Sequence, residues 1–147
     1  MRFGIWILAL SALLAGCATP DHVYLTWQGD TSTTMTVNFH TAGATSSVVC
    51  YDTRPHQGVL ADYPFRAEGT ARQIPGLKDG RQVHSVELTG LAPGAEYYFA
   101  IERGAGTRGR EFKFQTIPDD DTPLRFVVGG DMGTFPKTWL LMEEAAR

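Results

Sequence analysis

Cysteine is scarce in this chain of 147 residues, which contains only Cys17 and Cys50. A framework of several disulfides, which many small exported domains use in place of a large core, is therefore excluded. An excess of basic charge is also lacking, since 13 Lys and Arg stand against 16 Asp and Glu for a net charge of −3. We expect no nucleic-acid partner, because binding a phosphate backbone requires a basic surface.

Histidine is rare as well, with four residues at His22, His40, His56 and His84. None is paired with another at the i, i+2 or i, i+4 spacing typical of metal ligands on one element. We therefore expect these side chains to have roles on the surface or in the core.

Long apolar runs are confined to the N-terminus. Residues 1–16 lead from Arg2 through an apolar stretch into small residues, which is the pattern of a secretory signal peptide. The run is shorter than the roughly 20 apolar residues that span a bilayer. Leu14-Ala15-Gly16-Cys17 resembles the bacterial lipobox, so we expect an exported, membrane-anchored lipoprotein whose acylated first residue is Cys17. The alternative is a plain signal peptide that ends near a cysteine by chance. Cys50, in a β-rich segment, is expected to be a small buried hydrophobe.

After Pro20, apolar and polar residues alternate in short segments separated by Gly, Pro, Asp and Thr, which predicts an all-β domain at residues 17–117. A strand around residues 64–70 is expected at an edge, because Pro64 cannot donate a backbone hydrogen bond. Seven short strands with frequent turns are typical of an immunoglobulin-like sandwich. The seven strands are expected around residues 23–27, 35–39, 47–51, 64–70, 84–88, 97–101 and 112–116.

The segment Leu91-Ala92-Pro93-Gly94-Ala95-Glu96-Tyr97 predicts a tyrosine corner. In such a corner Pro93 and Gly94 form the turn, and the hydroxyl of Tyr97 bonds back to the backbone a few residues upstream. The spacing resembles the fibronectin type III pattern. An unrelated hairpin loop is the alternative.

A second unit is expected after the sandwich. Residues 118–123 place three aspartates between two prolines, which predicts a linker. Residues 124–128 read as a short buried strand, a Gly-rich turn follows, and a helical pattern begins at Pro136. This pattern still runs at Arg147 without a stop signal, so we expect residues 124–147 to be the first strand and helix of a truncated α/β domain.

The candidate metal site is Gly129-Gly130-Asp131-Met132-Gly133, at the expected carboxyl end of that strand. A carboxylate is a hard ligand that suits iron, manganese, magnesium or zinc. Flanking glycines let the backbone bend tightly and leave room for an ion. Taken alone, the same residues are also those of an ordinary turn.

Together these motifs resemble the purple acid phosphatase family. The resemblance covers residues 22 to about 147 and includes the corner, Phe112-x-Phe114-x-Thr116-x-Pro118 and the strand that leads to Asp131. It implies a β-sandwich joined to a metallophosphoesterase domain that hydrolyses phosphate esters with a dinuclear metal centre, iron with a divalent Fe, Zn or Mn. Asp131 would ligate one ion, and the two cations would activate a bound water. Gly133 stands where many other metallophosphoesterases have histidine.

The remaining ligand motifs of that family are absent from these 147 residues. We therefore assign no catalytic residue and expect the chain itself to be inactive and to hold no metal, with the activity belonging to the full-length protein. The rival interpretation is a fibronectin-like adhesion or carbohydrate-binding module of a surface lipoprotein.

Overall fold

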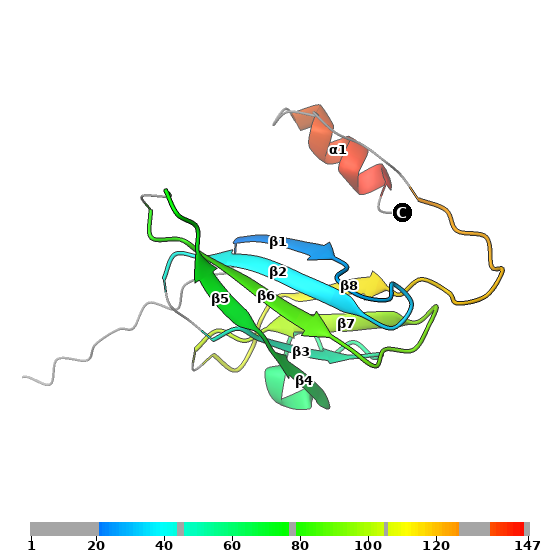
Figure 1. Cartoon of the computed structure of the whole chain (residues 1–147), viewed down its shortest axis with the longest axis horizontal. Helices are drawn as coiled ribbons and strands as arrows, with labels where there is room; N and C mark the ends of the chain where they lie inside the picture. Colours follow the sequence, from blue (N-terminus) through cyan, green and yellow to red (C-terminus); the bar gives the residue numbers. More distant parts are fainter. Residues whose placement is uncertain (1–20, 44–45, 77–78, 105, 127–135, 146–147) are drawn as a thin grey trace, which may run out of the picture.

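A computed structural model describes residues 21–43, 46–76, 79–104, 106–126 and 136–145. In this part of the chain, eight strands form two four-stranded antiparallel sheets (Figure 1). The first sheet has the order β1-β2-β6-β5, with β1 at Asp21–Thr26, β2 at Met35–Thr41, β6 at Gln82–Leu88 and β5 at Thr70–Gln73. The second has the order β4-β3-β7-β8, with β4 at Phe65–Glu68, β3 at Val48–Asp52, β7 at Glu96–Ile101 and β8 at Glu111–Gln115.

The all-β sandwich predicted from the alternation is confirmed. Alternate residues of the central strands point between the sheets, and they form one buried cluster that includes Val37 and Phe39 of β2, Val86 of β6 and Phe99 of β7. The strand order corresponds to the A-B-E-D and C′-C-F-G arrangement of immunoglobulin-like sandwiches. The two sheets are therefore held together by side chains from opposite faces rather than by a covalent bridge.

The predicted number of strands was wrong by one. The single edge strand expected around residues 64–70 is two strands that belong to different sheets, β4 and β5, with Gly69 between them. A Cβ at Gly69 would lie 2.0 Å from the carbonyl oxygen of Ser85, so the backbone passes too close to β6 for any other residue. At this glycine the chain crosses from one sheet to the other.

A second, smaller apolar cluster lies on the outer face of the second sheet. Val48, Cys50 and Ala100 are covered there by Tyr63 and by Leu60, which begins the short 3-10 helix η1 at Leu60–Asp62. Cys50 is buried, as the sequence predicted, and burial raises the pKa of its thiol. The loop that contains η1 thus covers this part of the outer face of the second sheet.

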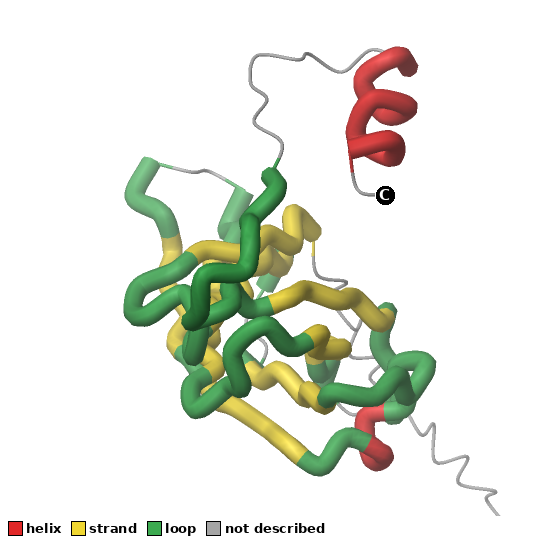
Figure 2. Tube along the Cα trace, turned by 90° about the vertical axis from the view of Figure 1, so that its right-hand side faces the viewer, coloured by secondary structure: helices red, strands yellow, loops and turns green. Residues whose placement is uncertain are grey.

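After β8 the chain continues as an exposed segment. Residues 124–126 form no strand, although the sequence predicted that one begins there; a buried strand needs neighbouring strands to bond its backbone. Residues 127–128 of that expected strand lie outside the described residues. The helix expected from Pro136 is α1, Pro136–Ala145, which lies apart from both sheets (Figure 2). No described helix is long and apolar enough to cross a membrane.

Candidate functional site

Asp131, the predicted metal ligand, and Cys17, the predicted site of acylation, lie outside the described residues. Among the residues that are described, no group of three or more His, Cys, Asp or Glu could hold a metal ion. The described side chains thus do not fit a dinuclear centre. What the structure defines is the end of the sandwich from which the chain leaves toward Asp131.

We call this end of the sandwich, where the chain leaves after β8, the exit. Its first part is the corner formed by residues 91–97. The hydroxyl of Tyr97 accepts a hydrogen bond from the backbone N–H of Ala92 at 2.9 Å, which is the contact expected of a tyrosine corner. The ring of Tyr97 is buried and stacks on Phe114, with ring centroids 5.5 Å apart. Gly94, after Pro93 in the turn, has a φ of 63°, in the left-handed region that favours glycine.

Thr116, just after β8, is hydrogen-bonded to this corner. Its hydroxyl donates to the carbonyl of Ala92 at 2.7 Å and accepts from the N–H of Ala95 at 2.9 Å. Its own N–H donates to the carbonyl of Ala95 at 3.0 Å. Thr116 itself is only 1% exposed, and its hydroxyl is satisfied by these backbone groups in place of water.

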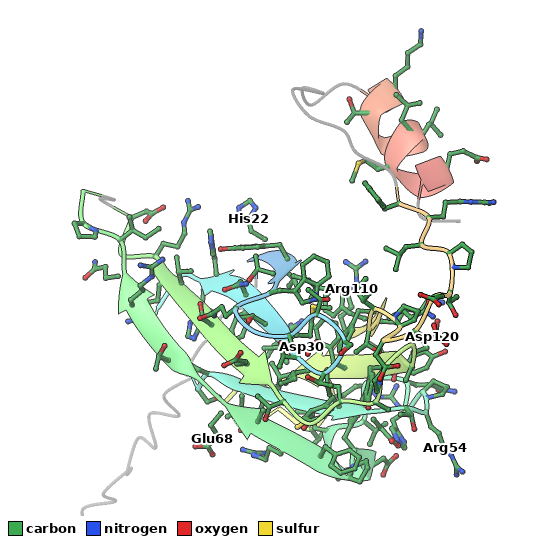
Figure 3. All side chains as sticks on the ribbon, turned by 45° about the vertical axis from the view of Figure 1, so that its right-hand side comes forward. His22, Asp30, Arg54, Glu68, Arg110 and Asp120 are labelled. Atoms are coloured by element: carbon green, nitrogen blue, oxygen red, sulfur yellow. The ribbon has the colours of Figure 1, made fainter. Side chains whose placement is uncertain are left out.

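The turn between β1 and β2 is also hydrogen-bonded to the segment that follows β8. The N–H and the hydroxyl of Ser32 both donate to the carboxylate of Asp30, at 2.7 and 2.6 Å, and these bonds hold the pKa of Asp30 below its ordinary value. The carbonyl of Thr31 in this turn accepts from the N–H of Ile117 at 3.2 Å. Asp30 lies in this turn and Asp120 in the segment after β8, both labelled in Figure 3.

A hollow of about 670 Å³ opens at this end of the sandwich. Trp27, directly after β1, is 50% exposed, and Phe126 is 74% exposed. The hollow is lined by Trp27, Thr31, residues 115–118 and residues 122–126. The surface next to the segment that leads to Asp131 is thus largely apolar.

Comparison with known proteins identifies the sandwich. Residues 20–116 match the family described as "Purple acid Phosphatase, N-terminal domain". The chain belongs to the purple acid phosphatase family. It is 33% identical over 119 residues to "Acid phosphatase type 7" of Mus musculus, which covers 78% of this chain and 26% of that protein. It is 31% identical over 117 residues to "Probable purple acid phosphatase 20" of Arabidopsis thaliana, covering 78% and 25%. The chain therefore spans about a quarter of the length of these relatives.

The purple acid phosphatase domain contains a polar cluster that sequence reasoning missed. The carboxylate of Glu111 accepts hydrogen bonds from the hydroxyl of Tyr63 at 2.6 Å and from the N–H of His56 at 2.7 Å. Burial, and then the bond to Glu111, raise the pKa of Tyr63 well above its ordinary value. A further hydrogen bond of 2.7 Å joins the ring of His56 to the carboxylate of Asp52. These groups bond one another and fix the loop over β3, so we assign them a structural role.

A buried histidine is the second feature that the sequence left open. His84 lies within the core of the purple acid phosphatase domain, stacked on Phe39 with ring centroids 4.5 Å apart. Its two ring nitrogens are hydrogen-bonded to the hydroxyls of Thr41 and Ser47, each at 2.8 Å. Burial, followed by the charge of nearby His40, lowers the pKa of His84. Burial inside the sandwich thus disfavours the charged form of the ring.

Proposed function

We propose that this chain is the N-terminal part of an exported phosphatase that hydrolyses phosphate esters at a dinuclear metal centre. The observation that carries the proposal is the family match over residues 20–116, followed after a short linker by the motif Gly129-Gly130-Asp131-Met132-Gly133. Both relatives are named as acid phosphatases or purple acid phosphatases. The sandwich would fix the position from which the metal-bearing segment starts.

Asp131 is the residue of this chain that would hold a metal ion. Its carboxylate is a hard anionic ligand, and the neighbouring glycines leave space beside it. Because the described residues supply no further ligand group, the other ligands of such a centre would come from outside them. A lone carboxylate binds divalent ions weakly in water, so the 147-residue chain is expected to be metal-free and inactive.

The substitution Asp131→Asn in the full-length protein tests this assignment. It keeps the size of the side chain and removes the charge that balances the cation, so bound metal and aryl phosphate turnover should fall together. Asp121→Asn is the matched control, since Asp121 is an exposed residue in the segment before the motif. Full metal content with unchanged turnover in Asp131→Asn would rule out the ligand role.

We also propose that the protein is anchored to a membrane through acylated Cys17. The support is the Leu14-Ala15-Gly16-Cys17 sequence at the end of the apolar run. Each buried methylene of an acyl chain contributes about 0.8 kcal/mol to membrane binding. Mass spectrometry of the mature N-terminus checks this, with Cys17→Ser as the control that should lose the lipid. An intact segment 1–16 or an unmodified Cys17 in the wild type would contradict it.

A carbohydrate-binding module is the second candidate, favoured by a polar hollow of about 770 Å³ on the outer face of the first sheet. Asn38 lies in this hollow, but its amide already donates to Thr26 at 2.9 Å and its amide oxygen accepts from Ser85 at 2.7 Å. With these groups engaged inside the protein, the phosphatase assignment has the better support.

A further inference from the structure

Several large apolar side chains are exposed together at the exit of the sandwich. Trp27, Leu124 and Phe126 are between about half and three-quarters exposed, and all three line the hollow described above. They come from two segments nearly a hundred positions apart in the sequence. Contiguous apolar surface of this kind, next to polar residues, marks an interaction site in a soluble protein.

Helix α1 has exposed apolar residues as well. Leu140, Leu141 and Met142 are all more than half exposed. Consecutive residues of an α-helix point about 100° apart, so these three side chains occupy more than one side of the helix. Exposed apolar side chains on a helix are surface that a packed domain normally buries. The segment after the sandwich thus also has apolar surface to bury.

We propose that the hollow around Trp27 is the docking surface for the phosphatase domain of the same polypeptide, with Trp27 as its main anchor. This inference rests on the proposed function, since it takes the occupant to be the domain that contains Asp131. It adds a task for the sandwich, which is to hold that domain in a fixed orientation.

The length of the connection favours this occupant. Only residues 127–135 separate Phe126 from α1, and nine extended residues reach at most about 30 Å. A short tether of this kind gives an effective concentration in the millimolar range, so a modest apolar contact is enough for docking. Since the matched sandwich is an N-terminal domain and covers about a quarter of the relatives, most of their length lies outside it.

The side of the hollow that belongs to the sandwich is held by hydrogen bonds. Thr116 and Ile117 are hydrogen-bonded to the corner and to the β1–β2 turn, so the backbone on this side of the hollow is fixed before anything docks. Tryptophan is among the residues that dominate binding at the centre of an interface, because its large ring is apolar and loses little conformational entropy. Trp27 therefore has the position and the chemistry of an anchor residue.

Cleavage of the linker in the full-length protein tests the proposal. Residues 119–121 are exposed aspartates, so an aspartate-specific protease should cut there whenever the two domains separate. Trp27→Ala should raise the cleavage rate about tenfold, which corresponds to about 1.4 kcal/mol of docking free energy. Phe126→Ala should act in the same direction. Tyr24→Ala is the matched control, because Tyr24 is a similarly exposed aromatic residue of β1 that does not line the hollow.

Two further measurements make the outcomes distinct. Circular dichroism melting of each variant shows whether the sandwich is intact; if Trp27→Ala unfolds it, Phe126→Ala decides the question. Wild-type cleavage rates in an intact variant would overturn the docking proposal, as would an equal rise in Tyr24→Ala. A change of oligomeric state by gel filtration, without faster cleavage, would assign the hollow to a second copy and also overturn it. Failure of the phosphatase proposal appears separately, as unchanged metal content and turnover in Asp131→Asn.

Discussion

The hydroxyl of Thr116 donates a hydrogen bond to the carbonyl of Ala92 at 2.7 Å, although 24 positions separate the two residues. The same hydroxyl accepts from the N–H of Ala95, so one side chain satisfies two backbone groups of the corner. The last residue before the exit is thereby fixed to the corner that Tyr97 also supports. The direction in which the chain leaves the sandwich depends on this contact.

Replacing Thr116 by Val should destabilise the sandwich by about 1–3 kcal/mol, because nearly the same volume is kept while the part-buried hydrogen bonds to the backbone of Ala92 and Ala95 are lost. Denaturant midpoints of the two proteins measure the change. Thr70→Val is the matched control, since Thr70 is an exposed strand residue. A surface substitution of that kind should change stability by no more than about 0.5 kcal/mol. Equal midpoints for wild type and Thr116→Val would show that the hydroxyl contributes nothing.

Tyr97→Phe is expected to cost about 1–3 kcal/mol, since it leaves the N–H of Ala92 without its acceptor while keeping the stacked ring. Urea denaturation gives the value. Tyr98→Phe serves as the control, because the hydroxyl of the adjacent Tyr98 bonds to the exposed carboxylate of Glu96. If both variants unfold at the wild-type midpoint, the corner bond has no stabilising effect.

Gly69→Ala should destabilise the sandwich by about 1–3 kcal/mol or more, because the new methyl group would overlap the backbone of Ser85 and force the strands apart. Thermal melting followed by circular dichroism measures this. At Gly43, by contrast, an added Cβ would meet nothing within 4 Å, so Gly43→Ala is the control that should melt near the wild type. Similar melting temperatures for both variants would contradict the close approach at Gly69.

The stability of the sandwich should fall as the pH drops below about 6.5. The folded pKa of His84 lies below its ordinary value of 6.5, so the unfolded chain binds the proton first. The contribution of His84 to the stability of the fold is therefore complete above the pKa that His84 has in the unfolded chain. It declines as the pH falls toward the pKa of His84 in the folded protein, and then levels off. One such group gives a slope of at most about 1.4 kcal/mol per pH unit.

His84→Gln should flatten this dependence between pH 7.5 and 5, whereas His22→Gln, at an exposed ring, should keep it. Denaturant midpoints across this range test the prediction. Glu111 titrates in a separate window: burial raises its pKa, but hydrogen bonds from Tyr63 and backbone N–H groups hold it below its ordinary value of 4.5. Its contribution is lost only as the pH falls below that value. A wild-type slope that persists in His84→Gln would assign the effect to other groups.

The sequence was sufficient to predict the parts of the fold that depend on local pattern. Alternation in β2, β6 and β7 predicted their inward faces, and the spacing from Leu91 to Tyr97 predicted the turn that joins β6 to β7. The division into β4 and β5 was not predictable in this way. It depends on how closely Gly69 approaches Ser85, which is a contact between strands rather than a feature of the segment itself.

The same distinction applies to the polar contacts. Tyr63 and Glu111 are 48 positions apart, and no periodicity in either segment indicates that they bond. His84 occupies an inward position of β6, where the pattern predicts an apolar residue, and the hydroxyls of Thr41 and Ser47 supply the partners that its buried ring nitrogens need. For Asp131, the motif and the family remain the basis of the metal-ligand prediction.

The crossing at Gly69 also determines where this sandwich could pair with other chains. On that side the edge strands are β4 and β5, which belong to different sheets, and each offers a free edge only four residues long. The longer open edges are β1 and β8 on the opposite side. An irregularity in the pairing of β1 between Asp21 and Tyr24 interrupts the first edge, and Glu111 and Lys113 place charges along the second. Bulges and charged side chains discourage edge-to-edge aggregation, so these two open edges are poor templates for fibre formation.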